Sequence, residues 1–148
     1  MINEKRILLL ADDSENDLLL MRMAFKKVEA DIALQEVHNG EEAIAYLQGV
    51  APYSDRNHFP LPTVMLMDLN MPKKNGFDVL TWVRAQPGLK RLSIIVMTAS
   101  TRTEDIERAF ELGTNAFLVK PGNLDALVTM LRCLWDWIRI SRFAPLDA

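Results

Sequence analysis

The chain alternates between short apolar runs and longer segments in which apolar residues recur at helical spacing. Runs rich in Leu, Ile and Val, with the length of buried strands, cover residues 6–11, 32–38, 63–68, 92–99 and 115–120. Segments with helical periodicity cover residues 17–28, 39–49, 76–86, 103–113 and 123–143. This alternation predicts an α/β fold in which helices cover both faces of a five-stranded parallel sheet.

Small polar residues and glycines mark the expected ends of these helices. Ser14 and Thr103 are predicted N-caps, and Gly49 and Gly113 are expected to end two helices. The segment 50–62, between the second helix and the third strand, exceeds the usual length of about 2–6 residues for such a connection. Its prolines restrict it, and the sequence leaves open whether it is a tolerated insertion or a partner-binding loop.

Length and composition indicate one folded domain. The 148 residues are 49% hydrophobic and 25% charged, which is ordinary for a globular protein. We expect a single domain over residues 1–148, with its core at about 4–143, and no output domain, because only five residues follow Phe143.

Charge and cysteine content exclude several classes of partner. The net charge is −3 and basic residues form no block, so nucleic-acid binding is not expected. No apolar run reaches the length of a membrane span. The single cysteine, Cys133, forms no disulfide within the chain, which favours a reducing cytoplasm, and we expect it to be a small packed hydrophobe.

Polar residues gather at the carboxyl ends of the predicted strands. Asp12 and Asp13 follow the first strand, Asp68 ends the third, Thr98 ends the fourth and Lys120 ends the fifth. Parallel sheets place their ligands at this edge. Clustered carboxylates recruit a cation, and oxygen-only ligands favour Mg²⁺. With an ammonium and a hydroxyl opposite, the site is suited to holding a phosphoryl group on an aspartate.

These residues occur in motifs that identify a family. The motifs are the pair Asp12-Asp13, "MDLNMPKKNG" around Asp68, "TAS" at 98–100 and "FLVKP" at 117–121. In this order and spacing the chain resembles the receiver domains of two-component response regulators. The resemblance implies a CheY-like, flavodoxin-like fold with strand order 2-1-3-4-5.

The resemblance also implies a role for each site residue. Asp68 is the expected phosphoacceptor for a sensor histidine kinase. Asp12, Asp13 and Asp68 are the expected Mg²⁺ ligands together with the backbone carbonyl of Asn70, with Asp12 acting mainly through a metal-bound water. Self-phosphorylation and autodephosphorylation at Asp68 are the only reactions expected, so the chain is not otherwise an enzyme.

The resemblance further implies which residues change the conformation of the protein when it is phosphorylated. Lys120 and Thr98 would contact the phosphoryl oxygens, and this movement would change the surface formed by the fourth helix, fifth strand and fifth helix. Phe117 occupies the aromatic switch position, although an aromatic residue in a strand is commonly a core residue. The bond between Lys120 and Pro121 is expected to be cis.

In its long segment 50–62 and its expected lack of an output domain, the chain resembles the single-domain regulators that serve phytochrome kinases. A phytochrome is therefore a candidate kinase for this chain. His38 and His58 lie off the strand-end cluster, and neither is expected to be a phosphodonor.

The last predicted helix has more apolar surface than one sheet face requires. A second stripe, opposite the one expected to cover the sheet, contains Met130, Cys133, Trp137 and Ile140. We expect a homodimer through this stripe, with the helix extending past the body of the domain. The alternative is that another segment of the same chain covers it.

Two other functions compete with phosphoryl acceptance. A phosphatase of the haloacid-dehalogenase type needs a second carboxylate two residues after its nucleophile, and Asn70 occupies that position. A receiver-like interaction module that takes no phosphoryl group would have lost an acidic residue, the threonine or the lysine, and all of them are present.

Overall fold

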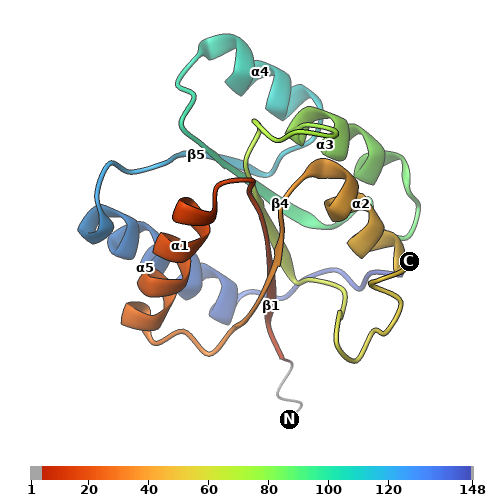
Figure 1. Cartoon of the computed structure of the whole chain (residues 1–148), viewed down its shortest axis with the longest axis horizontal. Coiled ribbons are helices and arrows are strands. Elements are labelled where there is room, and N and C mark those ends of the chain that lie inside the picture. Colours follow the sequence, from red (N-terminus) through yellow and green to blue (C-terminus); the bar gives the residue numbers. More distant parts are fainter. Residues whose placement is uncertain (1–4, 148) are drawn as a thin grey trace.

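Five parallel strands form one sheet in the computed structural model, which describes residues 5–147 (Figure 1). The strands are β1 (Ile7–Ala11), β2 (Ala33–Val37), β3 (Val64–Met67), β4 (Ser93–Thr98) and β5 (Ala116–Val119). Their order is β2-β1-β3-β4-β5, as predicted. The order reverses between β1 and β3, and ligands of open α/β sheets bind at such a point.

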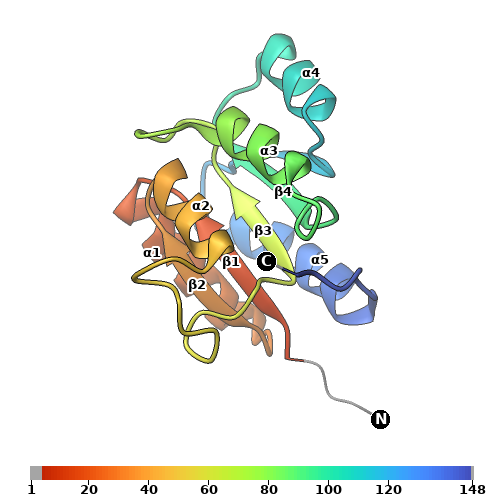
Figure 2. The ribbon, with the colours of Figure 1, turned by 90° about the vertical axis from the view of Figure 1, so that its right-hand side faces the viewer.

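Helices cover both faces of the sheet, so the central strands β1, β3 and β4 are buried from two sides. The helices are α1 (Glu15–Val28), α2 (Gly40–Gln48), α3 (Gly76–Ala85), α4 (Thr103–Glu111) and α5 (Leu124–Ile140). Residues of α1 and α5 pack in one hydrophobic core, and residues of α2, α3 and α4 pack in the other (Figures 1 and 2). Because both faces are covered, β1, β3 and β4 are largely continuous apolar runs, whereas the edge strand β2 contains Gln35 and Glu36 and is half-buried over most of its length.

One of the predicted N-caps is correct and one is wrong. The Ser14 hydroxyl caps α1 by accepting a hydrogen bond from the backbone of Asp17. Thr103 is the first helical residue of α4, and Arg102, whose side chain forms no cap bond, precedes it. Ser100 takes over part of this role, because its hydroxyl accepts from the backbone N–H of Arg102 and donates to an α4 carboxylate.

The last helix ends at Ile140, earlier than predicted. The tail that follows it, residues 141–147, does not project from the body but crosses the edge of the sheet at which the strands start (Figure 2). Leu146 packs against the core on the face opposite α5, and the Asp147 N–H donates to the carbonyl of Gly88 at 2.8 Å. The tail is thus a strap between the two cores.

Gly88 is the residue that lets this strap approach. A Cβ built at Gly88 would collide with the backbone carbonyl of Asp147. We expect Gly88→Ala to displace the tail, expose Leu146 and lower the free energy of unfolding by about 1–2 kcal/mol. Urea denaturation measures this, with Gly122→Ala as control because a Cβ there meets nothing within 4 Å. Equal stability of the two variants would contradict the strap.

The segment 50–62 packs on the body of the domain. The Arg56 guanidinium donates to the backbone carbonyls of Tyr46, Leu47 and Phe59 at 2.7–3.1 Å. The rings of Tyr46, Tyr53 and Phe59 contact one another, with centroids 5.2–6.0 Å apart. These contacts explain why so long a connection is ordered, and they leave open whether it also binds a partner.

The second stripe of α5 is largely exposed. Cys133, Trp137 and Ile140 are exposed, whereas Met130 is half-buried against the core. The expectation that Cys133 is packed within its own chain is therefore wrong, because it lies on the face of α5 turned away from the sheet. Trp137 is partly covered by the tail, through the ring of Phe143, whose centroid lies 5.5 Å from that of Trp137. Among the described residues, no helix has the length and apolarity needed to cross a membrane.

Candidate functional site

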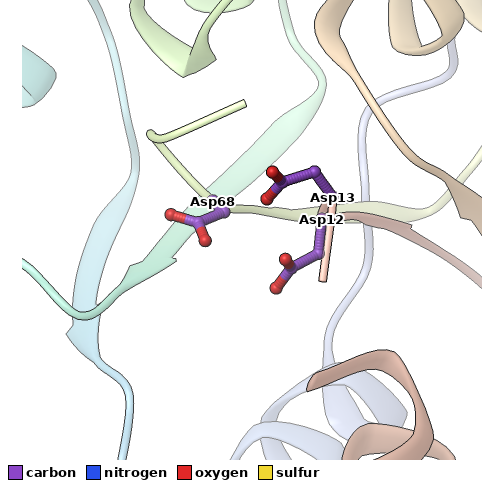
Figure 3. Close-up of side chains that lie close together, drawn as sticks. All are labelled: Asp12, Asp13 and Asp68. Atoms are coloured by element: carbon purple, nitrogen blue, oxygen red, sulfur yellow. The ribbon is translucent and has the colours of Figure 1, made fainter. Parts of the chain in front are cut away.

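The strand register brings the aspartates of β1 and β3 together. Ala11 pairs with Met67, so Asp12 and Asp68 leave neighbouring strands at the same level, and the Asp68 N–H donates to the Ala11 carbonyl at 2.9 Å. Carboxylate oxygens of Asp12, Asp13 and Asp68 lie within 4.8 Å of one another (Figure 3). The predicted acidic cluster is therefore present.

Lys120 completes the cluster from β5. Its Nζ donates to Asp12 and Asp68 at 2.8 and 2.7 Å, and to Asp17 in the first turn of α1 at 2.7 Å. The backbone N–H of Lys120 also donates to the Thr98 carbonyl, which fixes the end of β5 beside β4. All three protons of the ammonium are used.

The backbone holds the remaining oxygens of two carboxylates. Oδ1 of Asp12 accepts from the backbone N–H of Ser14 at 2.9 Å, and Oδ1 of Asp68 accepts from that of Asn70 at 3.1 Å. Each of these carboxylates thus has one oxygen oriented by the backbone and the other by Lys120. The protein's own hydrogen bonds therefore orient both carboxylates.

Burial and hydrogen bonding shift the pKa values of this site in opposite directions. Burial raises the pKa of Asp12, and the hydrogen bonds from Lys120 and Ser14 offset only part of that shift. Burial alone would lower the pKa of Lys120, but its hydrogen bonds to Asp12, Asp17 and Asp68 outweigh burial and raise it. The lysine therefore stays charged, and a proton competes with a cation for Asp12 at acidic pH.

Thr98 has a buried hydroxyl without a protein partner. Among the described residues, its Oγ1 is the buried side-chain oxygen or nitrogen that makes no hydrogen bond. Leaving a buried hydroxyl unpaired costs about 1–3 kcal/mol. An acceptor arriving at the strand edge would relieve this cost, which fits the predicted contact with a phosphoryl oxygen.

The donor set fits a hard divalent cation. Asp13 is exposed, so the cluster is open to solvent on one side, whereas Asp12 and Asp68 are only 8% and 7% exposed. Three carboxylates and no sulfur or imidazole favour Mg²⁺ or Mn²⁺. Whether the Asn70 carbonyl also binds the ion stays a prediction.

Two other predictions concern Phe117 and the peptide bond before Pro121. Phe117 is half-buried, pairs with Val96 in the sheet and packs against the core that contains α3. The predicted cis bond before Pro121 is wrong, because across residues 5–147 the cis peptide bond is the one between Ala51 and Pro52. The trans form of an X–Pro bond is favoured by about 0.5–1 kcal/mol, and a proline permits cis without requiring it.

Asp17 is a site residue that the sequence did not reveal. An acidic residue in the first turn of a helix is ordinarily explained by the helix dipole, and Asp17 occurs at such a position. The place of α1 in the fold could have pointed to Asp17. The helix that follows β1 starts at the ligand-binding edge of the sheet, so its first turn faces the strand ends.

The comparison of the chain with protein families agrees with this site. The model of the response regulator receiver domain matches residues 8–132, and the chain belongs to this family. Its fold and acidic site are thus those of a protein of phosphorelay signal transduction.

One relative with a solved structure is itself a response regulator. The chain is 35% identical to response regulator Rcp1 of Synechocystis sp. over 130 residues, covering 88% of this chain and 86% of Rcp1. The Mn²⁺-bound structure of Rcp1 has a TM-score of 0.83 and 32% identity, covering 94% and 99% of the two chains.

Two more solved structures are similar over nearly the whole chain. Response regulator RPA3017, from red light signaling of R. palustris, has a TM-score of 0.89 and 31% identity, covering 94% and 98% of the two chains. The phosphorylated cyanobacterial phytochrome response regulator RcpA has a TM-score of 0.85 and 28% identity, covering 98% and 100%.

Proposed function

We propose that this chain is a stand-alone cytoplasmic response regulator that accepts a phosphoryl group on Asp68 from a histidine of a sensor kinase. One observation supports this most strongly: Lys120 reaches the same two carboxylates, Asp12 and Asp68, that lie with Asp13 around a common centre. A nucleophile, a cation site and a fixed ammonium thus share one pocket.

Each residue then has a defined part in the transfer. A carboxylate oxygen of Asp68 would attack phosphorus, so that an O–P bond forms as the N–P bond to the donor histidine breaks. Asp12, Asp13, Asp68 and the Asn70 carbonyl would hold Mg²⁺, which supplies charge neutralisation. Lys120 binds a phosphoryl oxygen, and its charge offsets the added negative charge.

The proposal predicts Mg²⁺-dependent self-phosphorylation. Incubation with Mg²⁺ and acetyl phosphate should add one phosphoryl group per chain, because the small donor replaces the kinase histidine at Asp68. Intact-protein mass spectrometry measures this, and chelation of the metal should prevent it. A continuous turnover of small phosphate esters with no labelled intermediate would instead support the phosphatase function.

The similarity to RPA3017 and RcpA favours a phytochrome as the kinase. RPA3017 is described in red light signaling and RcpA as a phytochrome response regulator. We expect phosphotransfer from a phytochrome kinase to be faster than from an unrelated histidine kinase. Equal rates from both would remove the phytochrome assignment.

Phosphorylation would act on the surface formed by α4, β5 and α5. The unpaired Thr98 hydroxyl would move to the phosphoryl group, and Phe117, on a neighbouring strand of the same sheet face, would fill the space it leaves. Because Phe117 has no hydroxyl, it can transmit the change only through packing. An unchanged hydrogen-exchange pattern of α4 after phosphorylation would contradict this switch.

We also propose a homodimer through the second stripe of α5. Trp137 is 41% and Ile140 72% exposed, which is unusual for large apolar side chains on one helix face. We expect Ile140→Lys to weaken self-association at least about ten-fold by placing a charge in an apolar contact. Sedimentation equilibrium measures this, with Arg132→Lys as the control on an exposed position of the same helix.

The dimer should also respond to phosphorylation, because β5 and α5 are joined by the short segment that contains Lys120. We expect different dissociation constants for the phosphorylated and unphosphorylated forms. A monomer at high concentration in both forms would remove the dimer, and identical constants would remove the coupling.

A further inference from the structure

Lys120 is held by three carboxylates, and one of them lies outside the cluster of potential metal ligands. Asp12 and Asp68 belong to the group whose oxygens lie within 4.8 Å of one another, but Asp17 does not. Asp17 nevertheless makes a 2.7 Å ion pair with Lys120, as short as that of Asp68. Its carboxylate is thus directed at the lysine rather than at the cation site.

A bound cation changes the partners that Lys120 can keep. Oδ1 of Asp12 and of Asp68 is already held by a backbone N–H, so a metal would take the oxygens that accept from Nζ, and the lysine would lose two of its three partners. The Lys120 side chain is only 18% exposed, so water can replace few of these bonds. An ammonium left unpaired in such a place is costly.

Within residues 5–147, the side-chain acceptors that line the space around Nζ are the three carboxylates that it already contacts. Lys120 borders a cavity of about 60 Å³, and its polar lining residues are Asp12, Asp17, Asp68 and Lys120 itself. The other lining side chains are apolar, among them Leu18, Met21 and Met97. The cavity gives the lysine room to move, and Asp17 is the one carboxylate of its lining that lies outside the cluster of potential metal ligands.

We propose that Asp17 is a positioning residue that retains Lys120 when the metal occupies the other two carboxylates, and thereby favours Mg²⁺ binding. Its place in the first turn of α1 suits this role, because the backbone N–H of Asp17 is fixed by the Ser14 cap and the carboxylate is only about one-third exposed (34%). The inference rests on the proposed function, since it assumes that Mg²⁺ binds at Asp12, Asp13 and Asp68.

The test measures Mg²⁺ affinity of the unphosphorylated protein by isothermal titration calorimetry. The proteins are the unmodified chain, Asp17→Ala, Lys120→Met and the double variant, and circular dichroism verifies that each is folded. We expect Asp17→Ala to weaken Mg²⁺ binding about five-fold in the unmodified background, the loss of one partly exposed charge-assisted hydrogen bond. In the Lys120→Met background we expect less than about a two-fold effect, because the lysine that Asp17 retains is gone.

Asp17→Asn provides a milder variant that keeps an oxygen acceptor, and we expect it to retain more affinity than Asp17→Ala. Equal effects of Asp17→Ala in both backgrounds would overturn the inference, because Asp17 would then act on the metal through its charge or on α1 alone. The absence of Mg²⁺ binding by the unmodified chain would overturn the metal site itself, and this result is distinct from the loss of coupling.

Discussion

Replacing Asp68 by asparagine is expected to abolish labelling by acetyl phosphate and Mg²⁺. The amide of asparagine does not form an acyl phosphate, but its shape is nearly that of the carboxylate, and its single oxygen keeps one of the two hydrogen bonds, from the Asn70 N–H or from Lys120. The fold should therefore survive. The loss of one carboxylate should also weaken Mg²⁺ binding about ten-fold or more, because Asp68 is one of three clustered acidic side chains.

The matched control for this variant is Asp31→Asn. Asp31 is exposed in the connection between α1 and β2, on the edge of the sheet opposite the site. Phosphate incorporation and Mg²⁺ affinity of this control should equal those of the unmodified chain. Continued incorporation in Asp68→Asn at the rate of the control would place the acceptor elsewhere.

Replacing Arg84 by methionine is expected to lower the free energy of unfolding by about 2–4 kcal/mol. The half-buried Arg84 guanidinium donates to the carbonyls of Gly113, Lys90 and Leu92 and to the Asn115 side chain at 2.7–3.0 Å. It thereby ties α3 to the start of β4 and to the turn before β5. Methionine keeps the aliphatic volume but leaves these acceptors without their donors.

Urea denaturation measures this loss, with Arg91→Met as control because Arg91 is exposed in the loop before β4. We expect Arg84→Lys to lie between the two, since a single ammonium cannot reach all the acceptors that the planar guanidinium joins. A difference of less than about 0.5 kcal/mol between Arg84→Met and the control would contradict the structural role of Arg84.

The sheet and the acidic cluster were predictable because both depend on local patterns. Buried parallel strands need continuous apolar runs, and the strand ends converge in any such sheet. Asp12 and Asp68 follow their strands directly, so their meeting required only the strand order that the family resemblance supplied. Lys120 followed from the same argument at the end of β5.

The features that escaped prediction depend on contacts between distant segments. The pairing of Asp17 with Lys120 joins residues 103 positions apart, and no local pattern distinguishes it from a helix-dipole residue. The helix α5 ends at Ile140, where Ser141 is extended and the chain turns back toward Gly88, although Phe143 continues the apolar pattern past that point. Exposure of Cys133 likewise depends on which face of α5 meets the sheet.

The central claim is that Asp68 forms an acyl phosphate in a Mg²⁺-dependent way. The most direct measurement is to incubate the protein with acetyl phosphate, with and without Mg²⁺, reduce the acyl phosphate with borohydride and locate the modified residue by peptide mass spectrometry. Modification of Asp68 alone, and only with Mg²⁺, is the predicted result. Modification of His38, His58 or another carboxylate, or of none in the presence of Mg²⁺, would contradict it.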